Sequence, residues 1–245
     1  NVTGVQTCAL PIFDEELKSV FFKNGYSSQD RVTFVANMKN TIEQLWGEIH
    51  ENAKRDVKRA QKRNITVCEL ENRNQIGDFF SLFANWAKTK GLELNTSSRD
   101  IDKLWNDILE GTETVLLAYE NELLVSALRI SHFNKIAIAN FILSSYSNST
   151  SLGGPILTWN ALNWAKKKNM DYYDFTGGPL TALDVNNNKT QEAKLLFYKK
   201  KWGGTMLNNF SFTKPNKKLN YVIFKIFFMM IRVYHNQRMK NRSNN

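Results

Sequence analysis

The sequence has few of the residues that form metal sites or covalent cross-links. It contains two cysteines, Cys8 and Cys68, and three histidines, His50, His132 and His235. Two distant cysteines offer neither a disulfide framework nor a Cys-x-x-Cys metal spacing, so a reducing compartment is the default expectation. Histidines this scattered also argue against a zinc site. We therefore expect no metal and no tightly bound cofactor.

Acidic residues are missing from the C-terminal part of the chain. The last one is Glu192, and twelve lysines or arginines follow it. Removing those twelve from the 33 basic residues leaves 21, against 23 acidic ones, so the net charge of +10 belongs almost entirely to this end. A basic end attracts polyanions, such as nucleic acid, phosphorylated ligands or an anionic membrane surface. Charge alone does not choose among them.

The overall composition is that of a soluble protein with a substantial core. Hydrophobic residues make up 42% and charged residues 23% of the 245 positions. This content can fill one large domain, or one domain together with a fragment of another. The sequence contains no internal repeat and no long low-complexity segment.

The first twelve residues stand apart from the rest. Residues 2–12, VTGVQTCALPI, resemble the conceptual translation of a sequencing-library adapter. We therefore interpret residues 1–12 as an artefact, in which Cys8 and Pro11 have no structural role. The alternative is a signal-like segment, which is disfavoured because the stretch lacks a charged start and a long apolar core.

Hydrophobic periodicity predicts a helix over residues 41–63. Apolar residues at helical spacing mark its first half, and its second half, KRDVKRAQKR, carries basic residues on adjacent rows. Like charges on adjacent rows repel one another. An anionic partner is therefore one explanation of this pattern, and a solvated helix face is the other.

The rest of the chain predicts a mixed α/β sheet. A strand is expected at 65–70, helices at 75–90 and 99–109, and an antiparallel meander at 114–119, 123–131 and 135–145. A helix starting near Pro155 then leads to a strand at 171–175 closed by Gly177 and Gly178, a helix at 190–201 and a strand at 205–212. A helix that returns at once to a strand is half of a crossover unit. Ligands of such sheets lie beyond the carboxyl end of the strand, here at Asp174, Thr176, Gly177 and Gly178.

This order, β-α-α-β-β-β-α-β-α-β, is that of the GNAT acyltransferase fold, and three motifs resemble its FemAB-like branch. They are LWGEIHENAKRDVKRAQKRNITV, WNALNWAKKKNMDYYDFTGG and YKKKWGG, which begin at residues 45, 159 and 198. The resemblance implies a GNAT-like transferase domain at 64–214. Residues 13–63 would be the remnant of a preceding GNAT-like unit with a linking basic helix, and 215–245 a basic amphipathic helix and tail.

The resemblance implies transfer of an aminoacyl or acyl group onto an amine of a cell-envelope precursor, such as a lipid-linked peptidoglycan intermediate. The donor would be aminoacyl-tRNA and the location cytoplasmic, at the inner face of the plasma membrane. Direct attack by the amine needs no covalent nucleophile, and the sequence has no Gly-x-Ser-x-Gly and no evident Cys–His pair.

Two other functions stay open at this point. One is an acetyl-CoA-dependent N-acetyltransferase that acts on a sugar or peptide amine. The other is a non-catalytic module that binds RNA or a membrane. If the missing N-terminal unit is required for the acceptor, the fragment itself would be inactive.

The motifs also suggest site residues. Lys199 matches the family's motif lysine, Tyr198 stands where the family has Phe, and Asp174 would orient the amine, accept its proton or merely cap a turn. We expect substrate binding by Gly177, Gly178, Tyr146, Arg55, Arg59, Lys62 and Trp202.

A donor-phosphate loop is expected at Ser151, Gly153 and Gly154, before a helix start. GNAT enzymes typically carry R/Q-x-x-G-x-G/A in this loop, whereas this chain has TSLGGP. Proline in the last place removes a backbone donor. This departure counts against tight CoA binding and favours the aminoacyl-tRNA branch.

Residues 221–234, YVIFKIFFMMIRVY, are apolar but too short and too charged for an ordinary membrane span. Lys225 and Arg232 are seven residues apart and so share one helix face. The segment would lie in an anionic membrane interface or pack against the absent N-terminal unit.

Overall fold

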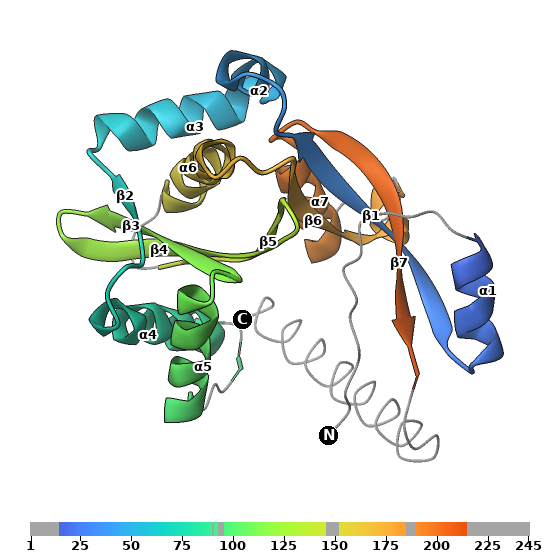
Figure 1. Ribbon diagram of the computed structural model, residues 1–245. Helices are drawn as coiled ribbons and strands as arrows, with labels where there is room; N and C mark the ends of the chain where they lie inside the picture. Colours follow the sequence, from blue (N-terminus) through green and yellow to red (C-terminus); the bar gives the residue numbers. More distant parts are fainter. Residues whose placement is uncertain (1–14, 90, 93–95, 146–151, 185–189, 215–245) are drawn as a thin grey trace, which may run out of the picture. The chain divides into compact units, whose positions relative to one another are not determined.

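The computed structural model describes residues 15–89, 91–92, 96–145, 152–184 and 190–214 (Figure 1). The chain divides into two compact units, one of residues 31–208 and one formed by residues 1–30 together with 209–245. The predicted artefact at 1–12 and the predicted membrane segment at 221–234 lie outside the described residues. Among the residues that are described, no helix is both long enough and apolar enough to cross a membrane.

The described residues form a seven-stranded sheet in the order β2-β3-β4-β5-β6-β1-β7 (Figure 1). The strands are β1 Ser27–Asn37, β2 Thr66–Glu69, β3 Glu113–Glu120, β4 Leu123–Phe133, β5 Ile136–Ser144, β6 Tyr172–Pro179 and β7 Thr205–Thr213. β3, β4 and β5 form an antiparallel meander and β2 pairs antiparallel with β3, whereas β5 and β6 run parallel. The mixed sheet and the element order from β2 onward confirm the predicted GNAT-like acyltransferase fold.

Two tight turns join the strands of the meander. Asn121 and Glu122 connect β3 to β4, and Asn134 and Lys135 connect β4 to β5; all four have positive φ. Two consecutive residues of positive φ match the twist of the flanking strands in a two-residue hairpin, and asparagine tolerates this conformation well. The predicted hairpins are therefore confirmed.

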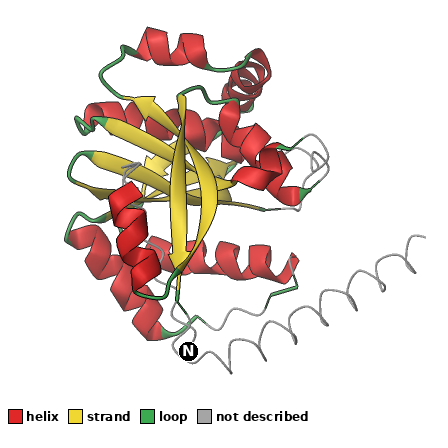
Figure 2. Cartoon of the chain, turned by 90° about the vertical axis from the view of Figure 1, so that its right-hand side faces the viewer, coloured by secondary structure: helices red, strands yellow, loops and turns green. Residues whose placement is uncertain are grey.

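Helices cover both faces of the sheet (Figures 1 and 2). α3 (Glu51–Lys62) and α6 (Gly153–Lys167) lie on one face, and α4 (Asn74–Thr89) and α5 (Ser98–Leu109) lie on the other. Side chains alternate along a strand, so Leu116 and Ala118 of β3 join the core under α6 while Val115 and Leu117 join the core under α4. α7 (Gln191–Lys200) packs against β6.

The helix expected over 41–63 is two helices. α2 (Ile42–Glu48) ends at Ile49, and α3 begins after His50, whose Nδ1 accepts a hydrogen bond from the backbone of Asn52 at 3.1 Å. The backbone N–H of His50 donates instead to the carbonyl of Lys201 at 2.8 Å. The helix breaks here because the His50 side chain caps the start of α3 and its backbone N–H is bonded outside the helix.

The boundary expected between residues 63 and 64 lies inside the unit of residues 31–208. β1, which lies in the segment expected to be the remnant of a preceding unit, pairs antiparallel with β6 from Arg31 to Asn37. Its Val32, Phe34 and Ala36 belong to the same core cluster as α3 and α6. In this structure β1 is therefore part of the sheet that carries the site.

Gly177 and Gly178 lie within β6, although the sequence predicted that they would close a shorter strand. A Cβ added to Gly177 would lie 1.4 Å from the carbonyl oxygen of Val32 and one added to Gly178 would lie 3.2 Å from Leu196 of α7. Gly177 is therefore required for the close approach of two strands, and β6 continues to Pro179 because β1 pairs with it.

The smaller unit is described in part. Its helix α1 (Glu15–Lys23) carries Phe21, whose ring stacks on that of Phe212 with a centroid distance of 4.2 Å and meets Tyr26 edge-on at 5.1 Å. Lys18 Nζ lies 4.3 Å from the ring centre of Phe210. These aromatic contacts hold the helix to the outer ends of β1 and β7.

We predict that Gly177→Ala lowers the unfolding free energy by more than about 2 kcal/mol, because the new methyl group overlaps the Val32 carbonyl. Urea unfolding measures this change. Gly77→Ala is the matched control: Gly77 lies in α4, and a Cβ there meets nothing within 4 Å. The unfolding free energy of the control should rise by about 0.5–1 kcal/mol, since alanine has a higher helix propensity than glycine. Equal effects at both positions would contradict the close packing of β6 on β1.

Candidate active site

A cavity of about 240 Å³ opens where β5 and β6 separate. The two strands pair only from Ile136 to Ile138, opposite Tyr172 to Asp174. Beyond these pairs, residues of both strands line the cavity, and α6, α7 and α4 close its sides. The lining comprises Trp86, Ala139, Asn140, Phe141, Ile142, Thr158, Tyr173, Phe175, Leu195, Tyr198, Lys199 and Trp202.

A β-bulge at the middle of β6 shapes the adjacent backbone. Thr33 pairs with Gly177 and Val35 pairs with Asp174, so β6 holds one residue more than β1 between these pairs. Thr176, inside the bulge, has a φ of +59°. A left-handed conformation costs a residue with a Cβ roughly 1–2 kcal/mol. Such strain persists only when surrounding contacts hold it, and bulges redirect side chains next to sites.

The contacts that hold Thr176 connect Asp174 to Lys199. Asp174 Oδ1 accepts hydrogen bonds from the hydroxyl of Thr33 and from the backbone N–H of Thr176, the latter at 2.6 Å. Lys199 Nζ, on α7, donates to the hydroxyl oxygen of Thr176. A half-buried carboxyl and a cation at the cavity are thereby joined through one threonine.

Burial dominates the electrostatics of the site. It raises the pKa of Asp174, although the hydrogen bonds from Thr33 and Thr176 and the charge of Lys199 partly oppose the rise. Burial also raises the pKa of Tyr173 and of Tyr198. Both phenols therefore stay protonated near neutral pH and are available as hydrogen-bond donors.

Tyr198 lies between α7 and the start of α6. Its hydroxyl is 3.4 Å from Thr158 Oγ1, and a Cβ on Gly154 would lie 3.5 Å from the same hydroxyl. Gly153 packs against β4, where a Cβ would meet Ser126 at 2.4 Å. The first turn of α6 is therefore adjacent to the cavity.

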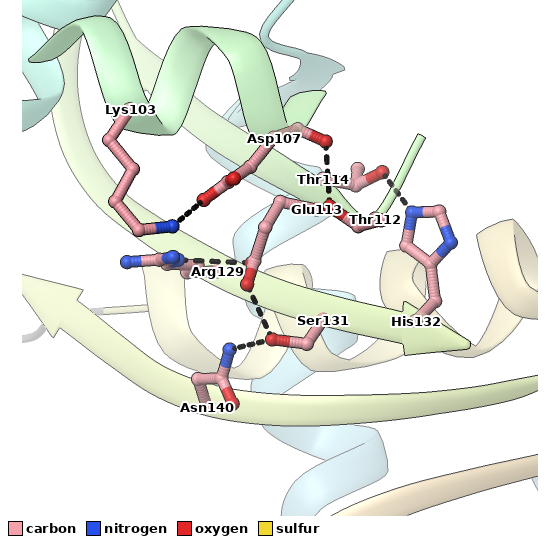
Figure 3. Close-up of polar contacts among 9 residues, drawn as sticks. All are labelled: Lys103, Asp107, Thr112, Glu113, Thr114, Arg129, Ser131, His132 and Asn140. Atoms are coloured by element: carbon pink, nitrogen blue, oxygen red, sulfur yellow. Dashed lines mark hydrogen bonds and ion pairs between the residues drawn. The ribbon is translucent and has the colours of Figure 1, made fainter. Parts of the chain in front are cut away.

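A second polar network reaches the cavity from the other side of β5 (Figure 3). Asn140, which lines the cavity, donates to Ser131 Oγ at 2.5 Å, and Ser131 donates to Glu113 at 2.6 Å. Arg129 binds the same carboxylate at 3.0 Å. This chain of contacts fixes the side chain of Asn140 at the rim.

The structure brings only part of the predicted site together. Lys199, Tyr198 and Trp202 line the cavity, and Asp174 reaches it through Thr176. Gly177 and Gly178 serve strand and helix packing and are not in the lining. Arg55, Arg59 and Lys62 lie on the exposed face of α3, and none of them lines the cavity. Tyr146 and Ser151 lie outside the described residues.

Sequence reasoning pointed to Thr176, at the end of the strand, but missed Thr33, Tyr173 and Asn140. Thr33 lies 141 positions before Asp174, whose carboxyl it contacts, and no local sequence pattern predicts a contact over that distance. Tyr173 belongs to the recognised YYDF strand, so its alternation with Asp174 was a usable signal for an inward-facing aromatic. Among the described residues, no group of three His, Cys, Asp or Glu side chains is placed to hold a metal ion.

No protein-family model and no curated protein matches the sequence. Solved structures do match. FemX superposes with a TM-score of 0.66 at 13% identity, covering 87% of this chain and 72% of that one. This chain has the FemX fold. Among the further matches, L-PGS from Bacillus licheniformis and the C-terminal domain of a putative lysylphosphatidylglycerol synthetase from Agrobacterium fabrum each have a TM-score of 0.57.

L-PGS is 13% identical to this chain, with 89% of this chain and 71% of that chain covered. The Agrobacterium fabrum domain is 10% identical, with 80% of this chain and 64% of that chain covered. At these identities the likeness concerns the fold, which agrees with the expectation from the three sequence motifs.

The raised pKa of Asp174 predicts how Asp174→Asn changes stability with pH. A raised folded-state pKa means that the protonated carboxyl is favoured in the fold, so its stabilisation is lost as the pH rises through that pKa. Asparagine stays neutral and its Oδ1 still accepts from Thr33 and Thr176. The variant should therefore gain unfolding free energy relative to wild type at about pH 7 but not at about pH 4. Urea unfolding at both pH values checks this, and a gain that is the same at both would contradict it.

Proposed function

We propose that this protein is an acyltransferase that moves an aminoacyl group onto an amine of a cell-envelope precursor, such as a lipid-linked peptidoglycan intermediate. The observation that carries the proposal is the cavity between β5 and β6, with Lys199 and Tyr198 at its side and Asp174 connected to Lys199 through Thr176. The FemX fold supports it. Further support comes from two similar structures whose names refer to a lysylphosphatidylglycerol synthetase or L-PGS.

The proposed chemistry is direct attack of the acceptor amine on the donor ester. As the C–N bond forms, the carbonyl carbon becomes tetrahedral and its oxygen gains negative charge; the C–O bond then breaks, and the leaving ester oxygen takes the proton that the amine gives up. The Lys199 ammonium and the Tyr198 hydroxyl are the groups at the cavity that would stabilise this oxyanion. The aromatic and aliphatic lining excludes water and strengthens both interactions.

Asp174 would act as a positioning residue in this reaction. It does not line the cavity, and its Oδ1 is occupied by Thr33 and Thr176. The charge of Lys199 lowers the pKa of Asp174 against the effect of burial, and Thr176 fixes where the Lys199 ammonium lies. Of the roles expected for Asp174, orientation thus has more support than acceptance of a proton.

Lys199→Ala should lower transfer at least about tenfold while donor binding is kept, because it removes the cation at the cavity. The measurement is transfer from charged tRNA to a lipid-linked muropeptide, with donor affinity measured in parallel. Lys200→Ala is the matched control, since Lys200 is exposed and does not line this cavity. A non-catalytic binding module would show no transfer in wild type either.

A tRNA donor fits the basic row on α3. Arg55, Lys58 and Lys62 are exposed on one side of this helix, whereas Arg59 has an ion pair with Asp56 at 3.5 Å. Three exposed cations along one helix are spaced to contact successive phosphates of a polyanion.

Replacing Arg55, Lys58 and Lys62 together by alanine should weaken tRNA binding and flatten its salt dependence. The logarithm of affinity should fall by about 0.7–0.9 per phosphate contact per log unit of salt in wild type. Each residue removed should lower that slope by about one. Filter binding over a salt series measures this, with Lys103→Ala on α5 as the control. A flat salt response in wild type would contradict a tRNA donor.

An acetyl-CoA-dependent N-acetyltransferase is the second candidate. It is favoured by the start of α6 beside the cavity, where Leu152 provides no side-chain cap and backbone N–H groups can face a phosphate. Micromolar binding of acetyl-CoA in a calorimetric titration would favour it, whereas a folded protein that binds none would favour the aminoacyl donor. A lipid-linked acceptor would place the reaction at the inner face of the plasma membrane.

A further inference from the structure

Two hydrogen-bonding groups in the cavity lining have no partner among the residues that the structure describes. They are the hydroxyl of Tyr173 and the indole N–H of Trp202; the Trp202 indole is near enough to the Tyr198 hydroxyl to influence its pKa but does not meet hydrogen-bond geometry. Tyr173 is 0% exposed and Trp202 is 2% exposed, so both are buried. Leu195 and Asn140, which also line the cavity, are exposed. The lining therefore combines solvent-accessible residues with two buried residues whose donors are unpaired.

Unpaired donors in an apolar surrounding are unfavourable. A buried polar group without a partner costs about 1–3 kcal/mol, so native proteins pair nearly all of them. Indole N–H only donates, whereas a protonated phenol donates through its hydrogen and can also accept. A ligand that enters the cavity and satisfies both donors must therefore bring an acceptor atom.

The charges around the cavity restrict the acceptor further. The Lys199 ammonium lines the cavity, so a second cation inside would be repelled, and the Trp202 N–H would stay unpaired beside it. The same burial that raises the pKa of Tyr173 and Tyr198 penalises a carboxylate next to them. A neutral oxygen, of a hydroxyl or an amide, meets both conditions.

We propose that Tyr173 and Trp202 select an acyl group whose side chain ends in a neutral oxygen, so that a hydroxyl- or amide-bearing aminoacyl group is preferred over an alkyl one of the same shape. This assignment rests on the proposed function, which identifies the cavity as the place of the acyl group. It deepens that function by naming the class of donor. The cavity volume of about 240 Å³ leaves room for a side chain of this size.

Specificity of this kind is strong because binding the wrong acyl group carries a free-energy penalty. When a site is built to hydrogen-bond a substrate oxygen, the analogue without that oxygen leaves buried groups unpaired. An alkyl group of equal shape would fill the same space and pair neither donor. The preference thus depends on the two polar atoms and not on the size of the cavity.

The test compares threonine methyl ester with valine methyl ester by isothermal titration to the wild-type protein. The two esters share the ester and the α-amine and differ by a hydroxyl in place of a methyl group. Wild type should bind the threonine ester at least about tenfold more tightly. Equal affinities, or binding of neither ester, would overturn the proposal.

Two variants assign the preference to the named groups. Tyr173→Phe removes the hydroxyl and should reduce the preference to within about twofold, while affinity for the valine ester is unchanged or improved. Trp202→Phe should reduce it in part. Tyr172→Phe is the matched control, because Tyr172 is 38% exposed, neighbours Tyr173 in β6 and does not line the cavity. A preference that survives in Tyr173→Phe would overturn the assignment to Tyr173, and ordered water would then be its partner.

Transfer assays separate this proposal from the proposed function. The same tRNA charged in turn with threonine and valine gives the ratio of transfer rates, which should follow the ester preference. An ester preference without transfer from either tRNA would refute aminoacyl transfer and leave the oxygen-selective cavity in place. Transfer from both charged tRNAs at equal rates would support aminoacyl transfer and refute the oxygen-selective cavity.

Discussion

The close approach of β1 to β6 is the contact on which the site depends. Gly177 lets the backbone of β6 lie against the carbonyl of Val32 with no room for a Cβ. That approach sets the register in which Thr33 meets Asp174, and the extra residue beside it forms the bulge that contains Thr176. Lys199 binds the side chain that the bulge presents. A packing constraint between two strands thus positions a cation on a helix.

The cavity follows from how far β5 and β6 stay paired. Parallel strands that pair over three positions and then separate leave a space that neither strand can fill alone. α6, which connects them, starts beside this space, and α7 covers it with Tyr198 and Lys199. The crossover connection therefore builds the walls of the cavity as well as the topology of the sheet. Burial around this space raises the pKa values of the two tyrosines that line it and of Asp174 next to it.

Much of the fold was predictable because its signals are local. The hairpins of the meander, the helix after Pro155 and the strand that follows it all lie within short windows of hydrophobic periodicity. The break at His50 was not predictable in this way. The chain from 41 to 63 has continuous helical periodicity, and the helix ends because a backbone donor finds the carbonyl of Lys201, about 150 positions away in the sequence. The role of the segment before residue 64 was hidden for the same reason, since β1 pairs with a strand far along the chain.

The sequence by itself determined the order of the elements and the basic row of α3, because periodicity and spacing are properties of adjacent residues. The resemblance of its motifs to the FemAB-like branch suggested Lys199 and Tyr198, and the end of the predicted strand suggested Asp174. Only the tertiary structure decided which side chains share the cavity. It assigned Gly177 and Gly178 to packing, joined Asp174 to Lys199 through Thr176, and left the buried Tyr173 and Trp202 with unpaired polar atoms in the lining. The physical reason is that burial and hydrogen-bond partners depend on contacts between β1, β6 and α7, which are distant in sequence and meet only when the sheet is assembled.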